Sequence, residues 1–174
     1  VGAALGYLDG EEARAYYVPF GHATPEKQAD PDHARSAVIS ALANAKHVVN
    51  HNLKFELHMS NAWSPGVPVI PPTAKLHDTM VQAYLIYEER SLKLETVVAS
   101  EDVSPWGDAY QAANLVNDTL RQLTKARRMP FRAYMARYGH SEVPVAIEAE
   151  YACRDVAHAL HLDRVQRKRA RGQG

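Results

Sequence analysis

Two pairs of side chains in this sequence combine a hydrogen-bonding group with a carboxylate four residues further on. Asn52 precedes Glu56, and Tyr151 precedes Asp155. Residues four apart lie on one face of an α-helix, so each pair can act on a single point in space. A carboxylate can hold a divalent cation, and a neighbouring polar group can aim a cation-bound water at phosphorus. The spacing is typical of phosphate chemistry, whereas the structural alternatives are an ordinary helix start for the first pair and a core tyrosine beside a surface aspartate for the second.

The elements that must position these pairs follow from the local pattern. A short β-branched strand is expected over residues 46–50, and a helix is expected from about Asn52 to Trp63. Asn52 would therefore lie where a helix begins at the end of a strand, which is a natural place for phosphate or metal chemistry. The second pair falls inside a long helix expected from about Ile147 to Lys168.

The remaining elements complete an α/β domain with a mixed sheet and a helical second half. Asp9-Gly10 is a hairpin signal between strands expected at residues 1–8 and 14–18. Asp30 is an N-cap, followed by proline at the first helical position, for a helix that ends near Asn44. A further strand is expected at 75–77, and further helices at 78–88, with Asp78 as the cap, and at 91–99, 108–128 and 131–138.

Length and composition describe one ordinary globular domain. The 174 residues carry 20 basic and 20 acidic side chains, so net charge indicates no partner. The single cysteine, Cys153, excludes an intrachain disulfide and suits a reducing interior. No apolar run reaches the length of a membrane span, and no signal peptide is visible. We assign residues 1–163 to the domain and the basic residues 164–174 to a tail or linker, with contact to nucleic acid as the alternative.

In their order along the chain, these motifs resemble the 3′–5′ proofreading exonuclease domain of family A DNA polymerases. Asn52 to Glu56 is similar to that family's second motif, in which an aspartate usually stands in place of Glu56, and Tyr151 to Asp155 is similar to its third motif. Residues 77–80 (His-Asp-Thr-Met) look like a segment between those two motifs, and residues 15–19 (Ala-Tyr-Tyr-Val-Pro) look like the end of a family strand. The resemblance covers nearly the whole chain and is weakest over residues 104–139.

The resemblance implies a ribonuclease H-like fold, a mixed twisted sheet with helices on both sides. It also implies hydrolysis of the 3′-terminal phosphodiester of single-stranded DNA with two divalent ions, Mg²⁺ or Mn²⁺, in the cytoplasm of a bacterium or a phage-infected cell. A polymerase domain in cis would be the partner. The residues that match the family's pattern are then assigned as follows: Asp155 and Glu56 as metal ligands, Tyr151 as the group that orients water, and Asn52, Lys54, Phe55 and Arg90 as substrate contacts.

The sequence departs from the family in two respects. The family's first motif, Asp-x-Glu on a first strand, is missing, because residues 9–11 (Asp-Gly-Glu) carry its letters but fall in the expected hairpin turn. Glu56 places its carboxylate one methylene further out than aspartate would. The resemblance therefore implies either residues before Val1 or a chain that is inactive alone. Two alternatives stay open: a catalytically inactive DNA-binding or scaffolding module, and an RNA 3′ exonuclease of the same superfamily.

Overall fold

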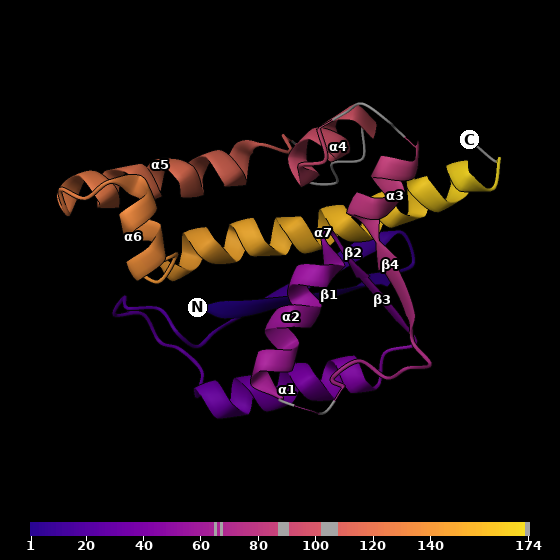
Figure 1. Ribbon diagram of the computed structural model, residues 1–174, viewed down its shortest axis with the longest axis horizontal. Coiled ribbons are helices and arrows are strands. Elements are labelled where there is room, and N and C mark those ends of the chain that lie inside the picture. Colours follow the sequence, from indigo (N-terminus) through magenta and orange to yellow (C-terminus); the bar gives the residue numbers. More distant parts are fainter. Residues whose placement is uncertain (65, 67, 87–90, 102–107, 173–174) are drawn as a thin grey trace.

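A computed structural model describes residues 1–64, 66, 68–86, 91–101 and 108–172. The chain is an α/β protein, and its second half is helical, as the sequence predicts. The longest helix, α7 (Val145–Ala170), crosses the molecule (Figure 1). On one side of it lie α4 (Leu94–Glu101) and α5 (Gln111–Ala126), and on the other lie α1 (Pro31–Ala43) and α2 (Leu53–Trp63). This helix contacts both strands of the N-terminal hairpin and also α3, α4 and α5, so it forms the centre of the structure.

The N-terminal hairpin consists of β1 (Gly2–Asp9) and β2 (Glu12–Pro19) in an antiparallel pair. The register runs from Gly2 opposite Pro19 to Asp9 opposite Glu12, which leaves a two-residue turn. Gly10 occupies the first turn position with φ of 63°, a conformation that glycine adopts without steric cost. The predicted hairpin and its turn are therefore confirmed.

Gly6 allows this hairpin to lie directly on α7. A Cβ atom at this position would come within 2.5 Å of the Arg14 carbonyl oxygen and 2.6 Å of Val156 Cγ1. One of these atoms belongs to the paired strand and the other to α7, so neither contact can be relieved by moving an exposed side chain. The close approach of hairpin and helix therefore depends on the missing side chain.

Replacing Gly6 with valine is expected to lower the free energy of unfolding by about 1–3 kcal/mol, the usual cost of overpacking. The matched control is Gly10→Asn, because a Cβ at Gly10 meets no atom within 4 Å and asparagine tolerates a positive φ. Urea unfolding of both variants measures the difference. Equal losses in the two variants would show that contact with α7 is not what requires glycine at position 6.

The other two strands form a separate pair. In the sequence, α1 (Pro31–Ala43) lies between the hairpin and this pair. Asp30 is the N-cap of α1, as predicted, because Asp30 Oδ1 accepts hydrogen bonds from the backbone N–H groups of Asp32 and His33. Then β3 (His47–Asn50) lies parallel to β4 (Lys75–Asp78). The single mixed sheet expected from the sequence is not formed by the described residues, because no strand among them joins β1 to β3.

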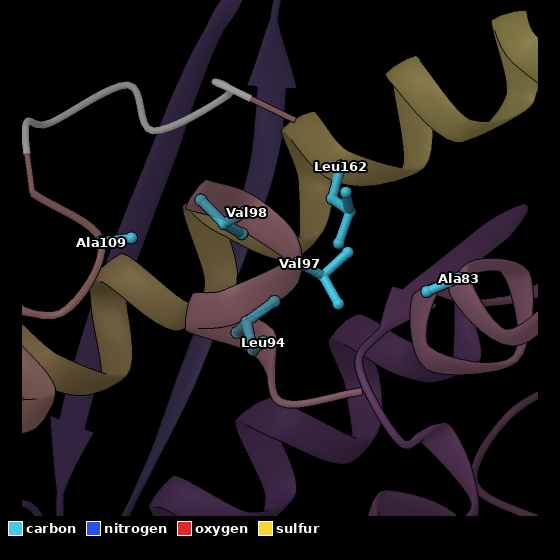
Figure 2. Close-up of a cluster of buried hydrophobic side chains, with 6 residues drawn as sticks. All are labelled: Ala83, Leu94, Val97, Val98, Ala109 and Leu162. Atoms are coloured by element: carbon cyan, nitrogen blue, oxygen red, sulfur yellow. The ribbon is translucent and has the colours of Figure 1, made fainter. Parts of the chain in front are cut away.

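The helical half packs on α7 through two apolar clusters. Figure 2 shows the first, in which side chains of α3 (Thr79–Ile86) and α4 (Leu94–Glu101) meet Leu162 of α7. The second joins α5 (Gln111–Ala126) and α6 (Phe131–Arg137) to the loop before α7, and the buried side chains in it are Val116, Leu120, Tyr134 and Val143. These clusters fix the position of α4, which contributes to the site described below.

The basic residues near the C-terminus lie in α7, which continues as far as Ala170. Three of them pair with acidic side chains: Arg164 with Glu11, Arg167 with Asp163 at 3.0 Å, and Arg169 with Glu101 at 2.8 Å. The helix expected to end near Lys168 is therefore confirmed, and it ends at Ala170. In the part of the chain that the structure describes, no helix is both long enough and apolar enough to cross a membrane.

Candidate functional site

The pair Tyr151 and Asp155 lies on one face of α7, and the two side chains are close enough for each to shift the pKa of the other. The Tyr151 ring packs against the apolar cluster of α5 and α6, and it also lies 6.4 Å from the His140 ring, measured between centroids. This packing restricts the orientation of the tyrosine ring. The pair is therefore preorganised by the fold.

Asp155 is electrostatically unusual for an aspartate. Its pKa is raised to about 7, chiefly by burial and also by the neighbouring carboxylates of Glu95 and Glu148, while the interaction with Tyr151 lowers it. The pKa of Tyr151 is raised as well, chiefly by burial and then by the charge of Asp155. Titratable groups with such shifts in a cavity are frequent at functional sites.

Glu95 and Glu148 are acidic residues of this site that the sequence analysis missed. Glu148 is 6% exposed, and its carboxylate accepts a 2.9 Å hydrogen bond from His140 Nδ1. Glu148 lies three residues before Tyr151 in the same helix, so helical spacing could have revealed it. Glu95 belongs to the first turn of α4, and only the packing of α4 on α7 brings it here. No local pattern could have identified it.

The second predicted pair lies where β3 meets α2 (Leu53–Trp63). Asn52 adopts the left-handed conformation with φ of 65°, and its backbone N–H donates to Asp78 Oδ1 at 3.1 Å. Asp78 Oδ2 accepts from Leu53 N at 2.9 Å, and Oδ1 also accepts from Met80 N at 2.9 Å. Asp78 is thus a helix cap for α3, as predicted. It also fixes the start of α2, which was not foreseen.

Glu56 projects from the first turn of α2. Burial by its surroundings raises the pKa of its carboxyl, and a side-chain hydrogen bond with Asn50 at the end of β3 opposes this shift. Asn50 also accepts from the His51 backbone N–H through Oδ1. Glu56 and the end of β3 therefore lie close together.

Both pairs face a single cavity, which we call the central slot. It has a volume of about 1670 Å³ and lies between the hairpin and the β3–β4 pair, so that β1 and β3 form its two edges. One wall is α7 with Tyr151 and Asp155, and the opposite wall is made by α1 and α2 and includes Asn52, Phe55 and Glu56. Two motifs about a hundred residues apart in sequence thus border the same space.

The other predicted substrate contacts are placed differently. Lys54 borders a shallower depression of about 500 Å³ on the outer side of α2, which Asn52 and Phe55 also border. The Phe55 side chain is 56% exposed, so its ring is available to a ligand. Arg90 lies outside the residues that the structure describes.

A metal centre can be tested against the donor groups present. Over the described ranges of the chain, no three His, Cys, Asp or Glu side chains lie close enough together to hold an ion. Two divalent ions in a nuclease site require several carboxylates around them, and Asp155 and Glu56 do not meet that requirement even with Glu95 and Glu148 in the same slot. These residues alone do not fit the two-metal centre that the resemblance implies.

Comparisons of this chain with models of protein families, with curated proteins and with solved structures give no match.

Proposed function

We propose that this chain is the larger part of a 3′–5′ exonuclease domain that acts on single-stranded DNA and has a ribonuclease H-like arrangement. The observation that carries the proposal is that Tyr151 and Asp155 on one wall of the central slot share that slot with Asn52 and Glu56 on the other. The order of a hairpin, a helix and a parallel strand pair is also the order in which the resemblance places these elements.

In this proposal each described residue has a definite task. The raised pKa of Tyr151 keeps its hydroxyl protonated, so it can orient a water molecule beside Asp155. Asp155 titrates near neutral pH and can exchange a proton with that water. The exposed Phe55 ring offers a surface on which a base can stack, and Lys54 can contact the DNA backbone. Divalent ions would bind only if further carboxylates joined the slot, because the described residues alone do not form a metal site.

Tyr151→Phe tests the proposal because it removes the hydroxyl and keeps the packed ring. In a chain extended upstream of Val1, with Mn²⁺ present, we expect this change to slow 3′-end shortening of single-stranded DNA by at least about tenfold, as general acid–base groups usually contribute about 10²–10⁴. Binding of the same oligonucleotide, measured by fluorescence anisotropy, should stay unchanged. Tyr110→Phe is the matched control, since Tyr110 lies outside the slot and bonds to Thr96.

A second candidate is a non-catalytic module that binds or scaffolds DNA. It is favoured by the incomplete donor set among the described residues and by glutamate at position 56. If the extended wild-type chain binds the oligonucleotide but leaves it uncut, this second function replaces the first. If RNA is shortened and DNA is not, the domain is an RNA exonuclease.

A further inference from the structure

Positive charge is concentrated where α5 turns into α6, at the end of the molecule away from α3 (Figure 1). Residues 118–142 carry six basic and two acidic side chains, a formal net charge of +4, while the other 149 residues carry 14 basic and 18 acidic side chains, a net charge of −4. The chain is therefore neutral only as a whole. All six basic side chains of this segment are exposed, and we call the surface that they form the basic corner: Arg121, Lys125, Arg127, Arg128, Arg132 and Arg137.

The two carboxylates of this segment are each engaged by an arginine. Asp118 accepts a 3.0 Å hydrogen bond from Arg121, and Glu142 forms an ion pair with Arg127. Glu142 also accepts a 2.9 Å hydrogen bond from the hydroxyl of Tyr134, which is fully buried and so fixes the carboxylate in place. Neither acidic group is therefore placed to neutralise the remaining cations.

The remaining cations are available to a partner. Lys125, Arg128 and Arg132 form no ion pair with any residue in the part of the chain that the structure describes. The basic segment near the C-terminus differs in this respect, because three of its arginines pair with acidic side chains. The basic corner is thus the surface on which positive charge is least compensated.

Arg128 holds a position that helices usually give to glycine. The N–H of Arg128 donates to the Lys125 carbonyl at 3.1 Å, and the N–H of Met129 donates to the Thr124 carbonyl at 3.2 Å, which is the hydrogen-bond pattern of a Schellman motif. Arg128 has φ of 50° at the left-handed position of that motif, where a Cβ atom is disfavoured. An unusual backbone conformation that retains a cation in an exposed turn points to a role for the charge.

The basic corner offers contacts for phosphates but few for bases. The guanidinium carbons of Arg127 and Arg137 lie 4.8 Å and 5.3 Å from the centre of the Tyr138 ring, so that ring is covered. Among residues 118–142, Phe131 is the one aromatic side chain that is mostly free of such cover, at 47% exposed. Single-strand binding relies on successive aromatic platforms, whereas a duplex presents one phosphate charge per about 1.7 Å of its axis. The arginine fork also matches phosphate geometry, and five of the six cations are arginines.

We propose that the basic corner binds the phosphate backbone of double-stranded nucleic acid without reading its sequence. Arg121, Lys125 and Arg128 are spaced four and three residues apart, so they follow one face of the end of α5 over roughly 10 Å. None of the six cations lines the central slot, and the segment lies where the resemblance to the exonuclease family is weakest. The inference therefore goes beyond the proposed function and holds or fails independently of it.

Fluorescence anisotropy with a closed duplex tests this proposal. The probe is a labelled DNA duplex of about 20 base pairs whose two ends are sealed by hairpin loops, so that it has no 3′ end, and the buffer contains EDTA, so that cleavage plays no part. We expect the chain 1–174 to bind this probe at 50 mM salt. Three phosphate contacts correspond to a slope of log K against log salt of about −2.7, or roughly fortyfold weaker binding at 200 mM salt.

A triple variant makes the test specific to the corner. Lys125→Gln, Arg128→Asn and Arg132→Gln together should weaken binding at 50 mM salt by at least about tenfold and remove most of the salt dependence. Asparagine is chosen at position 128 because it tolerates the left-handed conformation. Arg132→Gln alone should reduce the slope by about 1, which gives a second measurement with a single exposed change.

The matched control is Lys75→Gln, Lys168→Gln and Arg171→Gln, which removes three charges from other exposed sites and should leave binding within about twofold of wild type. Circular dichroism checks that both triple variants are folded. The proposal is overturned if the wild-type chain leaves the closed duplex unbound at 50 mM salt, or if the two triple variants lose affinity equally. It is also overturned if vesicles containing phosphatidylserine bind the corner and the duplex does not, since the partner would then be a membrane surface.

Discussion

Replacing Asp155 with asparagine is expected to stabilise the protein at pH 8 by about 2–4 kcal/mol while removing 3′-end cleavage. Burial and the carboxylates of Glu95 and Glu148 raise the pKa of Asp155 from 3.8 to about 7. A carboxyl whose pKa is higher in the folded state than in the unfolded state lowers stability as the pH rises from the unfolded pKa to the folded pKa, and the full cost remains at higher pH. A tenfold change in an ionisation constant corresponds to about 1.4 kcal/mol, and asparagine removes the charge while keeping the shape.

Urea unfolding at pH 8 measures this gain, and Asp163→Asn in the same helix is the control with the opposite sign. Asp163 is also buried, but Arg167 and His77 face it, at 3.0 Å and 3.4 Å respectively, and Gln82 donates to it at 3.1 Å. Removing one member of such a buried charge pair destabilises a protein. A loss of stability in both variants would show that Asp155 is an ordinary structural residue and not a strained functional one.

The second large effect concerns His158, which is 1% exposed on α7. Burial lowers its pKa from 6.5 to about 4, and the charges of Arg154 and His161 act in the same direction. Between those two values the unfolded chain binds a proton that the folded chain does not, so stability falls as the pH falls. This linkage corresponds to about 2 kcal/mol between pH 7 and pH 5.

The stability contribution of Asp155 changes in the opposite direction between pH 7 and pH 5, and by a similar amount. The wild-type protein should therefore show little net change in stability from Asp155 and His158 together. We therefore expect the His158 effect to appear in the Asp155→Asn background, as a loss of about 2 kcal/mol from pH 7 to pH 5. Adding His158→Gln should remove most of that loss. Denaturant midpoints at the two pH values measure it, and an unchanged loss in the double variant would assign the pH dependence to other groups.

The sequence predicted the features that depend on near neighbours. The Asp30 cap, the glycine turn at position 10 and the cap at Asp78 each follow from the conformation of a few consecutive residues. The two pairs at spacing four were also found, because one helical turn is enough to define a face. The resemblance supplied the order of the elements.

Other features depend on contacts between distant parts of the chain, and the sequence did not reveal them. Glu95 reaches Asp155 only because α4 packs on Leu162 of α7. Asp78 fixes the start of α2 because parallel pairing places Asn50 beside Asp78, across 28 residues of sequence. The separation of the four strands into two pairs likewise reflects which strands can reach each other, and alternation of side chains does not specify this.

The most direct test of the central claim is the polarity of cleavage by the chain extended upstream of Val1. A single-stranded DNA oligonucleotide with a 5′ label is incubated with this chain and Mn²⁺, and the products are resolved at single-nucleotide resolution. We predict a ladder that shortens one nucleotide at a time from the 3′ end and is lost in Asp155→Asn. Intact oligonucleotide, internal cuts, or immediate release of the labelled 5′ nucleotide would contradict the proposal that Tyr151 and Asp155 form the site of a 3′–5′ exonuclease.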